Sequence, residues 1–149
     1  KDWETIKAAE RAGKAQKGTL DGVAVGLPAL LRAKKLQKRA ARVGFDWPST
    51  DEVLDKIVEE AGELVEARDE LSQAEVEEEF GDLLFVMVNL GRHLGIESET
   101  ALRAANAKFT RRFESIERAL ATQGKTPEQS NLEEMDALWD AAKRAEKNT

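Results

Sequence analysis

Apolar residues recur every three or four positions along most of this chain of 149 residues, which is the spacing of amphipathic helices. A stretch with three glycines at residues 18–26 and the segment Phe-Asp-Trp-Pro at residues 45–48 interrupt the pattern, and we expect both to be loops. We therefore expect six helices, over residues 3–17, 28–43, 49–71, 74–94, 98–122 and 132–147. Because the junctions between them are short, neighbouring helices should run antiparallel, and the predicted fold is an all-α, antiparallel helical bundle.

Several of the predicted helix ends carry capping signals. Ser49, Ser72 and Ser130 each precede a glutamate by three residues, which is the capping-box spacing that opens a helix. Gly95 and Gly124 follow two of the predicted helices, in the position where glycine commonly ends a helix. These residues set the expected bounds of four helices.

Composition excludes several classes of chemistry. The chain has no cysteine and one histidine, which rules out disulfide frameworks, thiolate metal sites, cysteine nucleophiles and two-histidine zinc motifs. The spacing from Gly13 to Gly18 resembles a P-loop, but Thr19 follows where lysine is required. No apolar run approaches the roughly 20 residues of a membrane span, and the first residues do not have the charged-then-apolar pattern expected of a signal peptide. We expect a cytoplasmic location and no membrane partner.

Acidic residues are concentrated in one part of the chain. The net charge is −6, but residues 51–82 contain fourteen acidic and two basic residues, so the remainder is positive. Such a concentration of like charge repels itself unless cations offset it. Two interpretations are open, a solvated helix face or a divalent-cation site. A basic run at residues 32–42 is a solvated face or attracts nucleotides or acidic partners, and at this net charge we expect no specific nucleic-acid binding.

Two pairs of carboxylates in the acidic segment have the spacing of a metal site. Glu60 and Glu63 lie three residues apart, as do Glu79 and Asp82, so each pair shares one side of its helix. Two antiparallel helices joined by a short turn would direct both pairs toward the same space. Their oxygen ligands favour a hard cation, Mg²⁺ or Mn²⁺, over zinc. On spacing alone, an acidic hairpin without metal remains the alternative.

Two further features accompany these pairs. Gly62 and Gly81 lie inside the acidic motifs, although glycine destabilises a helix interior by about 1 kcal/mol relative to alanine. Close helix approach or room for a ligand would explain both. Residues 83–88 are apolar on all sides of a helix, so we expect the whole run to be enclosed, which a dimer achieves better than one small bundle.

The acidic motif belongs to a longer pattern. Glu-Glu-x-x-Glu at residues 59–63 is followed sixteen residues later by Glu-x-x-Asp at residues 79–82, and further characteristic blocks occupy residues 30–39, 43–47, 78–85, 89–94 and 106–113. In these blocks the chain resembles the MazG family of all-α nucleoside triphosphate pyrophosphohydrolases, in particular the C-terminal module of the two-module form. The resemblance implies that residues 1–27 are an N-terminal helix and linker that joins a preceding module. Residues 28–149 would then be the catalytic helical domain.

The resemblance also implies a reaction. A Mg²⁺-dependent enzyme of this kind, with Mn²⁺ as a substitute, converts a ribo- or deoxyribonucleoside triphosphate and water into the monophosphate and pyrophosphate, through attack of metal-activated water on the α-phosphorus. Members of the family are usually homodimers. By position, the metal ligands are Glu60, Glu63, Glu79 and Asp82, Glu59 positions the water or binds a further ion, Lys108 and Arg112 bind phosphates, and Trp139 contacts the base.

Alternatives stay open for several of these residues. Lys108 and Arg112 lie on one side of a predicted helix, where Glu114 and Glu117 would pair with them at the surface. Trp139 suits core packing as well as stacking on a base. Two alternative functions for the whole chain also stay open. One is a catalytically silent helical interaction module that binds a basic partner, and the other is a metal-dependent nuclease. The sequence does not assign a base or sugar preference.

Two further residues outside the acidic motif are candidates for a structural or binding role. Trp47 follows a loop aspartate and is suited either to packing or to stacking on a base. His93 lies late in a predicted helix and has no acidic partner nearby in sequence, so we expect a structural or exposed role for it.

Overall fold

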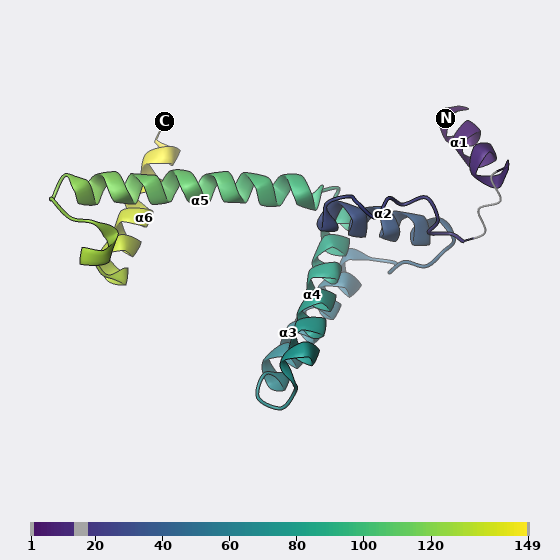
Figure 1. Cartoon of the computed structure of the whole chain (residues 1–149), viewed down its shortest axis with the longest axis horizontal. Helices are drawn as coiled ribbons and strands as arrows, with labels where there is room; N and C mark the ends of the chain where they lie inside the picture. The colour runs from purple at the N-terminus through teal and green to yellow at the C-terminus, as the bar shows by residue number, and fades with distance from the viewer. Residues whose placement is uncertain (1, 14–17, 149) are drawn as a thin grey trace. The chain divides into compact units, whose positions relative to one another are not determined.

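The computed structural model of the chain describes residues 2–13 and 18–148, without the side chains of residues 9–13. Every regular element in these ranges is helical, as the sequence predicts (Figure 1). The elements are α1 (Asp2–Gly13), α2 (Ala29–Arg42), α3 (Thr50–Ala67), α4 (Gln73–His93), α5 (Ser98–Ala121), the 3₁₀ helix η1 (Pro127–Gln129) and α6 (Leu132–Lys147). The predicted helical residues 14–17 lie outside the described ranges. No helix in those ranges is long and apolar enough to cross a bilayer.

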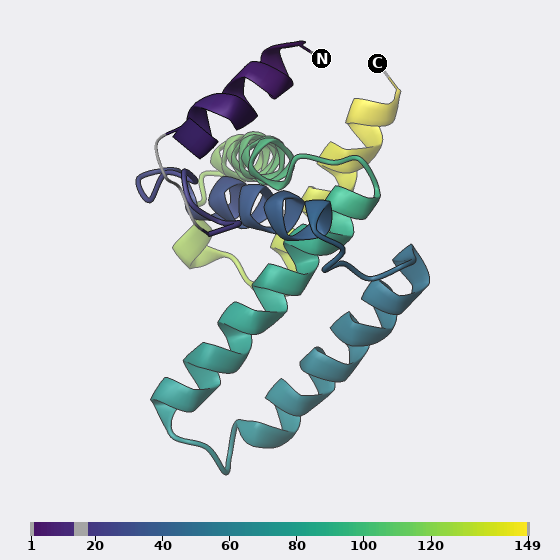
Figure 2. The same cartoon turned by 90° about the vertical axis from the view of Figure 1, so that its right-hand side faces the viewer.

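The chain divides into two compact units, Lys1–Glu99 and Thr100–Thr149. Within the first unit, α3 and α4 lie side by side and antiparallel, and α2 packs against α4 (Figure 2). A tight connection over residues 68–72 joins α3 to α4, as the short predicted junction requires. The boundary that we expect between residues 1–27 and 28–149 stays a prediction.

The ends of the α3–α4 hairpin show which capping signals act. α3 ends at Ala67, four residues before the predicted end, because the chain must turn before the extended backbone of the next cap. The capping box at Ser72 is complete, since its Oγ accepts a hydrogen bond from the Glu75 amide and the Glu75 carboxylate accepts one from the Ser72 amide. At Ser49 the hydroxyl accepts a hydrogen bond from the Glu52 amide, which is the serine half of such a box.

The core of the first unit is small. Val53, Val86 and Val88 are buried in it. The single chain does not wholly enclose residues 83–88, because Leu84, Phe85 and Met87 are each more than two-fifths exposed, and enclosure by a second copy stays a prediction. The chain therefore covers only part of the circumference of α4 in this stretch.

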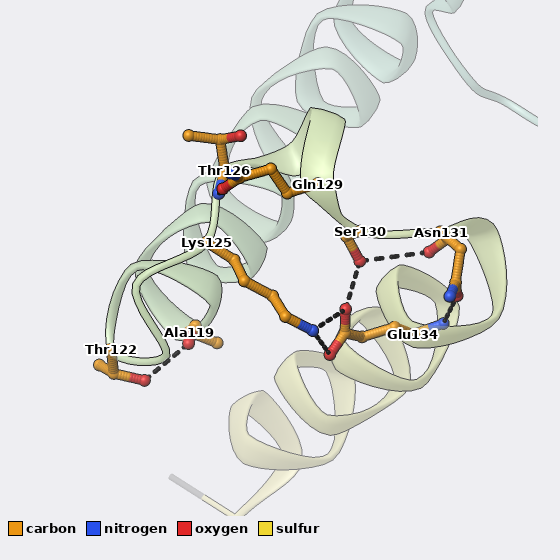
Figure 3. A network of polar contacts seen from close by, with 8 residues as sticks. All are labelled: Ala119, Thr122, Lys125, Thr126, Gln129, Ser130, Asn131 and Glu134. Atoms are coloured by element: carbon orange, nitrogen blue, oxygen red, sulfur yellow. Dashed lines mark hydrogen bonds and ion pairs between the residues drawn. The ribbon is translucent and has the colours of Figure 1, made fainter.

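In the second unit, a polar network organises the connection between α5 and α6 (Figure 3). Gly124 follows α5 with a positive φ of 72°, as its predicted position requires. The predicted capping box at Ser130 is wrong by one residue, because Asn131 is the N-cap and its side chain accepts a hydrogen bond from the Glu134 amide. Ser130 and Lys125 instead donate to the Glu134 carboxylate. The network thus links the start of α6 to the end of α5 through side chains.

Candidate metal centre

Three of the predicted ligands converge between α3 and α4. One carboxylate oxygen from each of Glu60, Glu79 and Asp82 lies within 4.8 Å of the other two. Glu60 belongs to α3 and is buried, with 8% of its surface exposed, whereas Asp82 of α4 is exposed. The group therefore lies at the rim of the hairpin core, open to solvent on the α4 side. We call it the acidic triad.

The local sequence explains how this geometry arises. Glu79 and Asp82 stand three residues apart on α4 and therefore share one side of the helix. α3 runs antiparallel beside α4 (Figure 2). This arrangement brings the carboxylate of Glu60 close to those of Glu79 and Asp82. The structure thus brings together three of the four predicted carboxylates, and their role as metal ligands stays a prediction.

The crowding of like charges affects Glu79. Removal from water raises its pKa first, and the negative charges of Glu60 and Asp82 raise it further. The charged form of Glu79 is therefore disfavoured in the absence of a counter-ion. A cation at the triad would reverse this balance, since it favours the charged form of every carboxylate around it.

Lys56 supplies a positive charge to this group, and the sequence-based prediction did not include it. Its Nζ lies 2.9 Å from Oε1 of Glu59 and 3.1 Å from Oε1 of Glu60. The hydrogen bonds to Glu59 and then to Glu60 raise the pKa of Lys56 above its usual range. The signal was present in the sequence, because Lys56 precedes the two acids by three and four residues, which is the spacing of helical ion pairs.

The two other predicted site acids lie beside the triad. Glu63 is exposed and does not share the 4.8 Å grouping, although its charge contributes to the raised pKa of Glu79. Glu59 is exposed and forms an ion pair with Lys56. The roles of Glu59 and Glu63 stay predictions.

Gly62 and Gly81 do not mark a close approach of helices within the chain. A methyl group at either Cα would meet nothing within 4 Å. The expectation of close packing at these glycines is therefore wrong for the single chain, and room for a ligand is the explanation that remains from the sequence.

The predicted phosphate- and base-binding residues belong to the second unit. Arg112 donates hydrogen bonds to Oε1 of Glu146 from Nη2, at 2.9 Å, and from Nε, at 3.2 Å. Its guanidinium carbon also lies 5.3 Å from the centre of the Trp139 ring, and the ring of Phe109 lies 5.5 Å from the same indole. Arg112 thus has a carboxylate partner on α6. The alternative pairing with acids on its own helix is not the one that forms.

Lys108 and Arg112 act on the same carboxylate. The hydrogen bond from Arg112 lowers the pKa of Glu146, and the charges of Arg112, Arg111 and Lys108 lower it further. Lys108 stands one turn before Arg112 on α5, as predicted. The basic cluster of α5 is therefore offset within its own unit by an acid on α6, a partner that helical spacing on α5 did not reveal.

His93 has a partner that is distant in sequence. Its Nε2 lies 3.0 Å from Oδ1 of Asp46, and the same oxygen accepts a hydrogen bond from Nη2 of Arg92. Burial acts to raise the pKa of Asp46, but the hydrogen bonds from His93 and Arg92 outweigh it and the pKa is lowered. These contacts tie the loop after α2 to the end of α4, which is the structural role expected for His93.

The donor set of the triad fits a hard divalent cation. All three groups offer carboxylate oxygens, and the single histidine of the chain is engaged by Asp46. Mg²⁺ and Mn²⁺ prefer oxygen ligands, and Mg²⁺ keeps several waters in an octahedral shell. Three carboxylates leave positions for water and for substrate oxygens. The triad therefore has the chemistry of a site that brings a metal to a phosphate.

Comparison with known proteins gives consistent results. Residues 49–116 match the MazG nucleotide pyrophosphohydrolase domain. The chain is 51% identical, over 146 residues, to the nucleoside triphosphate pyrophosphohydrolase of Escherichia coli K12, a match that covers 97% of this chain and 56% of that protein. It is 43% identical, over 143 residues, to the nucleoside triphosphate pyrophosphohydrolase/pyrophosphatase MazG of Thermotoga maritima. This match covers 96% of this chain and 54% of that protein. An uncharacterized protein of Bacillus subtilis, YabN, is 43% identical over 149 residues, and the match covers 30% of its length.

The chain thus spans little more than half the length of the first two relatives. The matched domain contains the whole α3–α4 hairpin, including the acidic triad, and continues into α5. Together with similarity that extends over nearly all of the chain, this match shows that residues 49–116 are a MazG nucleotide pyrophosphohydrolase domain.

Proposed function

We propose that the chain carries a Mg²⁺-dependent nucleoside triphosphate pyrophosphohydrolase activity. A ribo- or deoxyribonucleoside triphosphate and water would yield the monophosphate and pyrophosphate, with Mn²⁺ as a substitute metal. The observation that most directly supports this function is the convergence of three carboxylates within a MazG domain. Two relatives that are named nucleoside triphosphate pyrophosphohydrolases support the substrate class. A cytoplasmic location stays a prediction from the sequence.

The acidic triad would hold the metal. Glu63, one turn from Glu60 on α3, would join the three carboxylates through a change of side-chain rotamer. When bound, Mg²⁺ supplies a water of lowered pKa and neutralises negative charge on the phosphate oxygens. This charge reversal explains how an acidic hairpin accepts an anionic substrate.

The hydrolysis needs an acceptor that orients the attacking water. Glu59 is exposed and next to the triad residue Glu60, so we assign this role to it. Its hydrogen bond to Lys56 would have to open first. No covalent nucleophile is needed, because phosphoryl transfer depends mainly on positioning and on charge stabilisation.

The basic residues of α5 would bind the phosphate tail. Lys108 and Arg112 stand one turn apart, and a guanidinium binds phosphate and carboxylate in the same two-pronged way. Arg112 would therefore exchange Glu146 for a phosphate. Trp139 would stack on the base, although its contacts with Phe109 and Arg112 suit the packing alternative equally well.

We also propose a homodimer. Apolar side chains on α3 and α4 that are more than two-fifths exposed are Leu54, Val58, Val65, Phe80, Leu84, Phe85 and Met87. An apolar surface that extends along a whole hairpin is typical of a protein–protein interface. A second copy over this surface would also complete the enclosure of residues 83–88 that the sequence predicts.

A panel of nucleoside triphosphates, with pyrophosphate and orthophosphate measured separately, tests this function. We expect equal amounts of monophosphate and pyrophosphate, without orthophosphate, and only with Mg²⁺ or Mn²⁺. Cleavage of polynucleotides in place of free nucleotides would indicate a nuclease. If neither substrate is turned over and Mg²⁺ with a non-hydrolysable triphosphate leaves the melting temperature unchanged, the chain is an interaction module and not this enzyme.

A further inference from the structure

A cavity of about 550 Å³ lies in the first unit between α2, α4 and the loop that follows α2. Small-molecule sites in proteins have volumes of this order. Three aromatic side chains line it, Phe45 and Trp47 from the loop and Phe85 from α4. The acidic triad does not belong to its lining, so the cavity is not part of the site already described.

One wall of the cavity contains a buried amide with an unused acceptor. Gln37 of α2 is 7% exposed, and its Nε2 donates a hydrogen bond to the backbone carbonyl of Phe85 at 2.9 Å. Because a carbonyl only accepts, this bond fixes the orientation of the amide. Oε1 of Gln37 is then left buried without a hydrogen-bond partner. Burial of an unpaired acceptor destabilises a fold, and a donor carried by a ligand would explain its presence here.

Another part of the lining is held in place by hydrogen bonds. Asn89 of α4 is 2% exposed, and its Oδ1 accepts a hydrogen bond from Nε of Arg92 at 3.0 Å. Arg92 also binds Asp46, which fixes the loop that carries Phe45 and Trp47. These bonds hold the loop to α4 without a ligand, which lowers the entropic cost of binding.

The cavity lies on the same side of α4 as the acidic triad. Asp82, Phe85 and Asn89 follow one another at spacings of three and four residues, which places them along one side of the helix. At the helical rise per residue, Phe85 stands about 4.5 Å and Asn89 about 10.5 Å along the axis from Asp82. A nucleotide whose α-phosphate is held at Asp82 would direct its ribose along this side of α4 and its base into the cavity.

We infer that this cavity reads the edge of the substrate's nucleobase, with Oε1 of Gln37 as the acceptor for an amino or imino group. The inference rests on the proposed function, because that function supplies the phosphate end of the ligand. Aromatic walls suit a flat heterocycle, and an amide acceptor suits an amino or imino donor, whose position on the hydrogen-bonding edge differs among the bases. The stacking proposed above for Trp139 would involve a face of the base, whereas the contact with Gln37 involves its edge.

Tryptophan fluorescence tests the location of the base. The chain has three tryptophans, so the double variant Trp3→Phe/Trp139→Phe leaves Trp47 as the only reporter, and Trp3→Phe/Trp47→Phe leaves Trp139. Nucleosides are titrated without Mg²⁺, and α,β-methylene nucleoside triphosphates with Mg²⁺. We expect saturable quenching of Trp47 in both titrations. A change confined to the Trp139 reporter would overturn the inference.

The two titrations separate this inference from the proposed function. Quenching of Trp47 by nucleosides, in a protein that releases no pyrophosphate, would support a heterocycle site in the cavity and reject the hydrolase. Pyrophosphate release without any response of Trp47 would keep the hydrolase and reject the cavity as its base site.

A kinetic comparison tests the role of Gln37. Gln37→Met keeps the length of the side chain and removes its polar atoms, and Gln123→Met, at an exposed position, is the matched control. We expect Gln37→Met to change the ratios of kcat/KM among the four bases by about tenfold, with the control unchanged. Equal loss for all bases, or none, would contradict a role in reading the base. If Gln37→Met does not fold, the fluorescence titrations, which retain Gln37, decide.

Discussion

The carboxylates of the α3–α4 hairpin and the basic residues of α5 balance their charges in different ways. Arg112 meets Glu146 and the ring of Trp139 within its own unit. The members of the acidic triad meet one another, and the one ion pair that any of them forms among the described residues is between Glu60 and Lys56. Arg112 of the basic cluster thus has a carboxylate of its own, whereas the three carboxylates of the triad have one lysine among them, which is also paired with Glu59. The contrast indicates that the hairpin, more than α5, has negative charge that a cation would offset.

The largest expected effect is on activity. Asp82→Asn removes one charge of the triad and should lower Mg²⁺-dependent pyrophosphate release by about 10³-fold, because the metal then loses a ligand. Glu77→Gln, an exposed acid on the same helix, is the control and should retain activity. Circular dichroism should show the same helix content for both. A fully active Asp82→Asn would remove the triad from the mechanism.

The apolar surface of the α3–α4 hairpin can be compared with an exposed valine elsewhere in the chain. Val58 on α3 is 72% exposed within the surface that we assign to the dimer, and Val25, 83% exposed, lies in a loop. Val58→Glu should weaken the dimer by at least about tenfold, since it places a charge in an apolar interface. Val25→Glu should leave it unchanged. Sedimentation velocity over a range of concentrations measures both, and equal behaviour of the two variants would contradict the assigned interface.

Glu146→Gln tests whether the basic cluster can exchange its partner. Loss of the charge should release Arg112 and lower KM for nucleoside triphosphates roughly two- to fivefold. Glu114→Gln, on α5 itself, is the control. An unchanged KM would favour a purely structural role for Arg112.

The same variant has a pH signature. Arg112 holds the pKa of Glu146 below its usual value of about 4.3. The ion pair therefore stabilises the folded chain above that value, and this contribution is lost as the pH falls through the lower pKa of the folded state. Below about pH 4, we expect the melting temperature to fall more steeply for the wild type than for Glu146→Gln.

In the metal-free protein, Glu79→Gln should stabilise the fold, whereas loss of the Glu146 charge removes a stabilising ion pair. The expected change is smaller than those above. Because the pKa of Glu79 is raised in the folded chain, its charged form destabilises the fold at neutral pH, and the destabilisation is relieved as the pH falls. We expect a higher melting temperature for Glu79→Gln at pH 7.5 without metal, and a smaller gain on addition of Mg²⁺ than in the wild type. Glu66→Gln is the control. A lower melting temperature in Glu79→Gln would contradict charge crowding at the triad.

The smallest expected effect is at the glycines of the acidic motifs. Gly62→Ala and Gly81→Ala should each stabilise the chain by about 0.5–1 kcal/mol, because alanine is the better helix former and a methyl group meets open space there. Urea unfolding at protein concentrations too low for dimers measures the change. Destabilisation under those conditions would mean that the two positions are packed.

Local signals predicted most of the helices. The complete capping box at Ser72, and the positive φ of 73° and 72° at Gly95 and Gly124, follow from residue types that favour one conformation. The misplaced cap of α6 shows the limit of such signals. Ser130 and Asn131 are both good N-cap residues, and the choice of Asn131 depends on the bond that Ser130 makes to Glu134.

The candidate site was predictable where helical spacing alone determines it. Glu79 and Asp82 share a side of α4, and the short connection brings α3 beside them. Contacts between distant segments were not predictable in this way. The bond of His93 to Asp46 spans 47 residues and that of Gln37 to Phe85 spans 48, and both depend on how helices and loops pack.

Crystals soaked in Mn²⁺ and examined by anomalous diffraction test the metal site most directly. We predict a single strong anomalous peak bonded to carboxylate oxygens of Glu60, Glu79 and Asp82, and no such peak in Asp82→Asn crystals treated in the same way. A wild-type crystal in which Mn²⁺ binds elsewhere, while these three carboxylates remain bound only to water and Lys56, would contradict the assignment of the hairpin as a metal centre.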